Sequence, residues 1–173
     1  GTYDSGYSLK KKQYSSFQYT PTYLARSIVE QCLSNINLQN RESLKILDPA
    51  CGSSVFLLEL LKQLKSLSYQ GSIELNAWDS SDSAINISNF LLAYEKGEWG
   101  DSLTFKVEKV DNSLIKKWDA DYDLILMNPP FLSWDLMRKD YREVVAEILG
   151  DHSKKPNLAS AFVSKSAKCL KSD

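Results

Sequence analysis

The sequence predicts an α/β domain with a doubly wound, mainly parallel sheet, and three observations lead to this fold class. Short apolar runs alternate along the chain with longer segments that carry apolar residues at helical spacing. Alternating strands and helices form βαβ units, and ligands of such sheets bind beyond the carboxyl ends of the strands. Finally, an acidic or amide residue follows each of the four runs: Asp48, Asp79, Asp111 and Asn128. Polar chemistry is therefore expected along one edge of the sheet.

The expected elements follow one another from residue 20 to residue 170. Thr20 as N-cap and Pro21 as first helical residue open a helix that reaches about Cys32. The expected strands cover residues 44–47, 73–78, 103–107 and 123–127. Further helices are expected over residues 55–67, 82–97, 136–149 and 158–170. Residues 1–18 are polar, without a clear period, and are interpreted as an N-terminal arm before a domain over 19–173.

Composition suits one globular domain and gives no sign of a membrane protein. The 173 residues are 43% apolar and 25% charged, and no apolar stretch approaches the ~20 residues of a membrane helix. Lys10, Lys11 and Lys12 are not followed by the apolar core of a secretory signal, so a cytoplasmic protein is expected. Three distant cysteines and one histidine lack metal-ligand spacing, so no metal site is predicted.

Charge limits the ways in which nucleic acid could be held. The formal net charge is −1, and no strongly basic stripe occurs in the sequence. Proteins that grip DNA through its phosphates usually carry more positive charge. Either nucleic acid is not the substrate, or the surface that holds it lies mostly outside this chain.

The segment from Asp48 to Leu57 predicts a ligand-binding loop. Its small residues Ala50, Cys51, Gly52 and Ser53 would let a ligand approach the backbone between a strand and a helix. The N-terminus of that helix offers free N–H groups. A plain strand-to-helix turn is the alternative interpretation of the loop alone.

The tetrapeptide Asn128-Pro129-Pro130-Phe131 is the most informative motif. Two consecutive prolines fix the backbone and hold Asn128 at the end of the preceding strand. The amide oxygen of Asn128 and the carbonyl of Pro129 are two acceptors suited to one NH₂ group. Phe131 adds a flat face on which a base can stack, an interaction of roughly 1–3 kcal/mol in nucleic-acid sites.

Together these motifs resemble those of adenine-specific amino methyltransferases of DNA (gamma-type, from restriction-modification systems). The resemblance covers residues 17–170 and implies a Rossmann-like S-adenosylmethionine-dependent fold. It implies that the loop residues Asp48, Ala50, Cys51 and Gly52 bind the cofactor, with Asp79 on its ribose and Asp111 on its adenine. Tyr19, Thr20 and Pro21 match a segment that contacts the methionine end. Taken alone, Asp79 is better explained as the cap of a turn before the helix at 82–97, and Asp111 as a solvated turn residue.

Ser54 departs from the resemblance, because the matching loop ends in glycine. A Cβ is added where the loop packs tightly, so weaker cofactor binding than with glycine is expected. The implied activity is methyl transfer to the exocyclic amino group of adenine in DNA, with the base flipped out. Two alternatives stay open: a methyltransferase acting on glutamine or RNA, and a non-catalytic domain used for assembly or binding.

The resembling fold has seven strands, whereas only four can be counted here. The chain is therefore expected to be a partial, inactive catalytic domain that ends where a fifth strand would begin. The strand at 123–127 would then present an unpaired apolar edge, a template for self-association. The final helix, over 158–170, cannot supply backbone partners for that strand.

Overall fold

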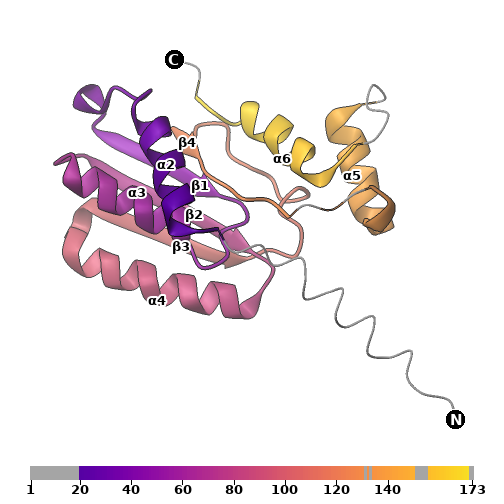
Figure 1. Cartoon of the computed structure of the whole chain (residues 1–173), viewed down its shortest axis with the longest axis horizontal. Coiled ribbons are helices and arrows are strands. Elements are labelled where there is room, and N and C mark those ends of the chain that lie inside the picture. Colours follow the sequence, from indigo (N-terminus) through magenta and orange to yellow (C-terminus); the bar gives the residue numbers. More distant parts are fainter. Residues whose placement is uncertain (1–19, 131, 133, 151–155, 172–173) are drawn as a thin grey trace, which may run out of the picture.

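The computed structural model contains a four-stranded parallel sheet with helices on both faces, which confirms the predicted fold class (Figure 1). It describes residues 20–130, 132, 134–150 and 156–171, so the expected arm at 1–18 lies outside it. The strand order is β3-β2-β1-β4, with bounds Ser43–Asp48 (β1), Ser72–Asp79 (β2), Leu103–Lys109 (β3) and Leu124–Ile125 (β4). The α-helices are Thr22–Leu33 (α2), Val55–Ser66 (α3), Asp82–Trp99 (α4), Lys139–Leu149 (α5) and Leu158–Ala167 (α6). Short 3₁₀ helices cover Leu38–Asn40, Gly100–Ser102 and Trp134–Leu136.

Two hydrophobic cores lie on opposite faces of the sheet because successive side chains of a strand point to opposite sides. Ile46 of β1 and Leu75 of β2 are fully buried in a cluster with residues of α2, α3 and α4. Leu47 and Trp78, on the other face, pack in a second cluster with residues of α5 and α6. No helix in the described part of the chain is long and apolar enough to cross a membrane.

The start of α2 differs from the expectation. Pro21 is the N-cap, with an extended ψ of 138°, and helical geometry begins at Thr22. The residue before a proline avoids helical dihedrals, so Thr20 stays outside the helix. Its hydroxyl binds Asn128 instead of a helix N–H.

Strand β4 is shorter than the expected 123–127, since only Leu124 and Ile125 pair with β1 in regular register. Hydrogen bonds from Asp123 N to Lys45 O and from Leu126 N to Leu47 O extend this pairing by one residue at each end. The prolines after Asn128 carry no N–H groups and end the ladder.

The outer edge beside β4 has backbone partners at Tyr122. Its N–H donates to the Cys169 carbonyl at 3.1 Å, and its carbonyl accepts from Lys171 N at 2.9 Å. Tyr122 and Leu170 form a parallel bridge. The residues after α6, rather than the helix itself, therefore supply backbone partners just before the expected strand at 123–127.

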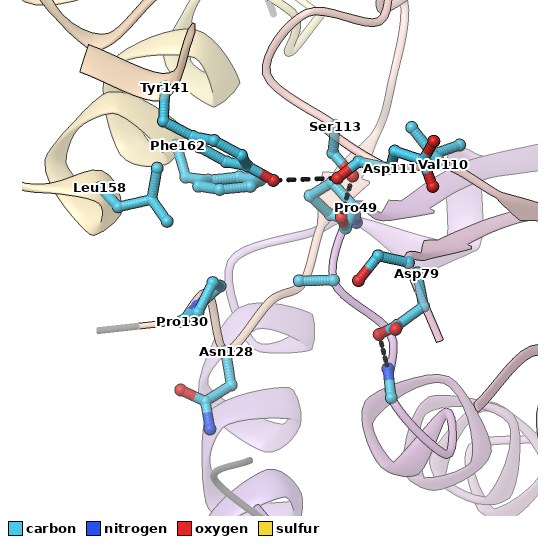
Figure 2. Close-up of a pocket in the computed structure, with 13 residues that line it drawn as sticks. Pro49, Asp79, Val110, Asp111, Ser113, Asn128, Pro130, Tyr141, Leu158 and Phe162 are labelled. Carbon is cyan, nitrogen blue, oxygen red and sulfur yellow. Dashed lines mark hydrogen bonds between the residues drawn. The ribbon is translucent and has the colours of Figure 1, made fainter. Parts of the chain in front are cut away.

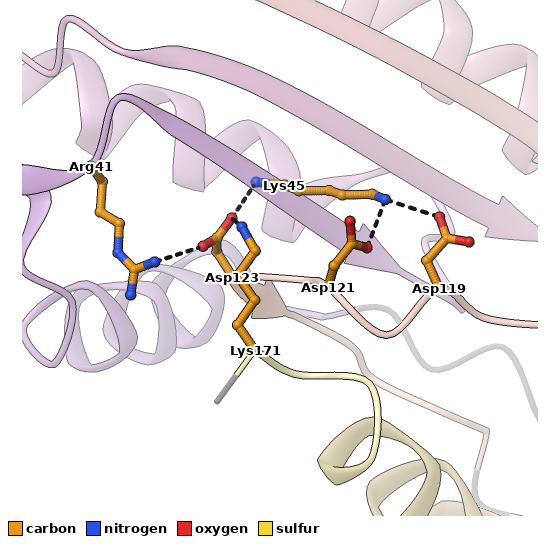
Figure 3. A network of polar contacts seen from close by, with 6 residues as sticks. All are labelled: Arg41, Lys45, Asp119, Asp121, Asp123 and Lys171. Atoms are coloured by element: carbon orange, nitrogen blue, oxygen red, sulfur yellow. Dashed lines mark hydrogen bonds and ion pairs between the residues drawn. The ribbon is translucent and has the colours of Figure 1, made fainter. Parts of the chain in front are cut away.

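A buried carboxylate ties three segments together at the amino ends of β1 and β4 (Figure 3). The Asp123 side chain is 2% exposed and accepts from Lys45 N at 2.8 Å, Arg41 Nη1 at 3.2 Å and Lys171 Nζ at 2.7 Å. The Lys45 ammonium binds Asp119 and Asp121. This network joins the start of β1, the start of β4 and the segment after α6.

Asp123→Asn should lower the free energy of unfolding by about 2 to 3 kcal/mol, since hydrogen bonds to a buried charged group are strong. Asp121→Asn is the matched control: its carboxylate is 56% exposed, and the loss should stay below about 1 kcal/mol. Urea unfolding of both variants measures the difference. Equal losses of unfolding free energy in the two variants would contradict the conclusion that Asp123 holds the network together.

Candidate functional site

Two adjoining cavities lie at the carboxyl ends of the strands, where the sequence places its polar residues. Figure 2 shows the first of them. Their volumes are about 240 and 260 Å³, which together fall within the size range of small-molecule sites. Four residues line both cavities: Ala50, Gly52, Asp79 and Asn128. Asp111 and Pro130 line the first cavity, and Thr20, Cys51 and Ser53 line the second. Most of the predicted site residues therefore come together around one continuous space.

The Asp79 carboxylate fixes the loop between β1 and α3. Its Oδ2 accepts from Gly52 N at 2.9 Å, and its Oδ1 accepts from Ser81 N at 2.9 Å. Gly52 has a φ of 53°, which glycine adopts without steric cost. A carboxylate has about four lone-pair sites, so Asp79 can still accept from two ligand hydroxyls.

Asp48 lies beneath this loop and does not line either cavity. Its carboxyl is 1% exposed, and Oδ1 accepts from Ala50 N at 3.1 Å. Burial, with a smaller contribution from the nearby Asp79, raises the pKa of Asp48 to about 8. A neutral, buried Asp48 orders the loop from below, whereas the resemblance implies that it binds the cofactor.

The segment after β3 closes the first cavity. Ser113 Oγ donates to the Pro49 carbonyl at 2.6 Å, which ties this segment to the loop after β1. The side chain of Asp111 is exposed at the cavity, and its carbonyl accepts from the Tyr141 hydroxyl at 2.9 Å (Figure 2). Asp111 is thus positioned by α5 as well as by the sheet.

Asn128 lies where both cavities meet. Its Nδ2 donates to Thr20 Oγ1 at 3.0 Å, so the amide oxygen is left as the acceptor for another group. Pro129 lies between Asn128 and Pro130 in the turn that follows β4. Two further predicted site residues, Tyr19 and Phe131, lie outside the described residues.

The lining of the cavities is acidic. Asp79 and Asp111 are lining residues, and neither lysine nor arginine is among the described residues that line the two cavities. Burial raises the pKa of the Cys51 thiol to about 12, so this thiol stays neutral. The site therefore suits a ligand that donates hydrogen bonds or carries positive charge, and it does not suit a phosphate.

Among the lining residues that the sequence analysis did not predict are three from the last two helices: Tyr141, Leu158 and Phe162. Tyr141 belongs to α5, and the other two belong to α6. Figure 2 shows their side chains on the same side of the first cavity, facing Pro130 and the end of β1. They give it an apolar wall on which a flat ring can pack.

Residues 6–171 match the family model described as N-6 DNA Methylase. The chain belongs to the N-6 DNA methylase family. The family uses S-adenosylmethionine, and two solved structures resemble the fold of this chain. A protein of Listeria monocytogenes, assigned to the class I S-adenosylmethionine-dependent methyltransferases, superposes with a TM-score of 0.62 at 17% identity. The methyltransferase subunit of a type I restriction-modification system from Streptococcus thermophilus superposes with a TM-score of 0.62 at 16% identity.

The N-6 DNA methylase chain described here spans only part of these structures. The match covers 96% of this chain and 49% of the Listeria chain, and 88% of this chain and 32% of the Streptococcus chain. At these identities the two structures establish the fold. The fit of a particular ligand depends on the geometry of the two cavities.

The raised pKa of Asp48 predicts a pH dependence of stability. The folded protein keeps the Asp48 proton up to about pH 8, whereas the unfolded chain releases it near pH 4. The contribution of the protonated Asp48 carboxyl to the free energy of unfolding is fully present below about pH 4, and it is lost as the pH rises to about 8. Between pH 6 and 8 the free energy of unfolding of the parent protein should fall by about 2 kcal/mol relative to that of Asp48→Asn. Urea unfolding at both pH values checks this, and parallel curves would show that Asp48 is ionised in the fold.

Proposed function

We propose that this chain binds S-adenosylmethionine across the two cavities and presents it to the exocyclic amino group of adenine in DNA. The observation that carries the proposal is the position of Asp79 at the junction of the cavities, beside a loop that it holds through Gly52. A ribose there can donate two hydroxyls to this carboxylate. The lack of basic lining residues in the described part favours this cationic ligand over a dinucleotide with its phosphates.

The two ends of the cofactor suit different cavities. The adenine ring fits the first, where Asp111 can accept from its amino group and Phe162 and Tyr141 offer apolar faces. The methionine end fits the second, beside Thr20 and the start of α2. The N-terminus of a helix favours a carboxylate. The resemblance adds Tyr19 to the residues proposed for this end of the cofactor.

The substrate amino group is assigned to Asn128. Thr20 engages the amide nitrogen and orients the amide oxygen as an acceptor. The carbonyl of Pro129 is the second proposed acceptor, and Phe131 is the proposed stacking surface for the flipped base. Two fixed acceptors hold the N–H bonds of the base, which directs the nitrogen lone pair toward the reacting carbon.

S-adenosylmethionine, when bound, supplies an electrophilic methyl group on a sulfonium. The adenine nitrogen forms a bond to the methyl carbon while the carbon–sulfur bond breaks, and the sulfur keeps the electron pair. The extra proton on nitrogen leaves to solvent. The residues of the chain hold the two reactants in line, and such alignment alone can lower the activation barrier by several kcal/mol.

We place DNA contact mainly in regions outside this chain, because its formal charge is −1. In this proposal, residues 19–173 form the cofactor-binding half of a catalytic domain. Methyl transfer from labelled cofactor to DNA, RNA and a glutamine-containing peptide separates the alternatives. N6-methyladenine in the digested DNA supports the proposal. Methylation of RNA or peptide alone, or cofactor binding without transfer by the whole protein, would favour one of the alternatives.

Asp79→Ala should weaken S-adenosylmethionine binding at least about tenfold, because it removes charge-assisted hydrogen bonds to the ribose and releases the loop at Gly52. Asp82→Ala is the matched control, since Asp82 is an exposed acid of the next turn that pairs with Lys109. Calorimetric titration measures both affinities. A similar, small change in the two variants would argue against a ribose site at Asp79.

Asn128→Ala, in the protein that methylates DNA, should lower the rate of transfer by about a hundredfold or more, as loss of a single positioned hydrogen-bonding group does elsewhere. The affinity for S-adenosylmethionine should change little, because the amide acts on the substrate amino group. Single-turnover kinetics and titration separate the two effects. Asn89→Ala, an exposed amide of α4, serves as the control. A collapse of cofactor affinity together with the rate would assign Asn128 to the cofactor instead.

A further inference from the structure

Ser54 has a backbone conformation that normally favours glycine. Its φ of 61° and ψ of 28° are left-handed, and its side chain is fully buried at the N-cap of α3. An L-residue is strained in this region, so some other interaction has to hold it there. The Ser54 side chain is absent from the described lining of both cavities, so its Cβ does not occupy ligand space.

The hydroxyl of Ser54 belongs to a directed chain of hydrogen bonds. Ser54 Oγ donates to Ser88 Oγ at 2.7 Å, and Ser88 Oγ donates to the Gly52 carbonyl at 2.9 Å. Ser88 is fully buried in α4, and Cys51 Sγ lies 3.8 Å from its hydroxyl. Helix α4, which also lines the second cavity, thus reaches the centre of the loop.

Gly52 is held on both sides as a result. Its N–H donates to Asp79 and its carbonyl accepts from Ser88, each at 2.9 Å. Gly52 also lines both cavities, so a shift of this residue changes the space on either side of Asp79.

We propose that Ser88 is a positioning residue for the cofactor loop and that Ser54 acts with it as a coupled pair. The inference rests on the proposed function as far as the ligand is concerned. Ser54 is then an adapted residue whose hydroxyl supports the loop, and the weaker binding expected from its added Cβ is offset by its contact with Ser88. Hydrogen bonds linked in series strengthen one another, so neither hydroxyl acts alone.

A double-mutant cycle on cofactor affinity tests the coupling. Titration compares the parent, Ser54→Gly, Ser88→Ala and the double variant. Ser88→Ala should weaken S-adenosylmethionine binding about threefold to tenfold in the parent, because it leaves two buried groups without partners. In the Ser54→Gly background, Ser88→Ala should weaken S-adenosylmethionine binding about threefold or less. Equal factors in both backgrounds, or no loss in either, would overturn the proposal.

Amide hydrogen exchange of the unliganded protein tests, without any cofactor, whether Ser88 anchors the loop at Gly52. Ser88→Ala should speed amide exchange at Gly52 and Ser54 about fivefold, and the milder Ser88→Cys should speed it less. Exchange in β1 should stay unchanged in both variants. Ser166→Ala is the control: it removes a buried helical hydroxyl that donates to Phe162 O, and loop exchange should not respond. Unchanged exchange at Gly52 would overturn the anchor. If the parent binds no S-adenosylmethionine while Gly52 exchange rises, the proposed function fails and the anchor stands.

Discussion

The parallel pairing of β1 with a strand on each side is the constraint on which the site depends. Asp48 of β1 is in register with Ala77 of β2, and Leu47 is in register with Ile125 of β4. Three chain segments therefore leave the sheet at the same edge. The loop after β1 begins between its neighbours, where the Asp79 carboxylate can reach a loop N–H. In an antiparallel sheet, alternate strands would end at opposite edges, and this contact would not form.

The distribution of charge follows from the same arrangement. At the amino ends of β1 and β4, cations surround the buried Asp123 and compensate its charge. At the carboxyl ends, burial without a cation raises the pKa of Asp48, whereas Asp79 stays at the surface of the cavities. An uncompensated buried carboxylate is costly, so the proton on Asp48 removes that cost. Asp79, which lines both cavities, therefore keeps an open path to a ligand, whereas the buried Asp48 does not.

Sequence patterns predict the sheet and the strand-end residues that line the cavities, because strand periodicity and the strand-end rule depend on local features. They do not reveal that Asp48 is buried while Asp79 lines the cavities, since the direction of each side chain depends on how the following loop folds. Thr20 and Asn128 are 108 positions apart, and only the tertiary structure reveals their contact. Tyr141 is unpredictable for a similar reason, because the packing of α5 against α6 decides where it points.

Backbone groups form much of the site, in a fold that is shared with solved structures at 16 to 17% identity. The loop is held by the N–H and carbonyl of Gly52, and the neighbouring segment is held through the carbonyl of Pro49. These backbone groups are present whatever the loop side chains are, so the residues that must be kept are few, and they include the side-chain partners Asp79, Ser88 and Ser113. A left-handed position such as Ser54 is one of these few, because its φ excludes most side chains. A serine is accommodated there because α4 places a second hydroxyl within 2.7 Å of its own, so the residue that makes Ser54 acceptable lies 34 positions away.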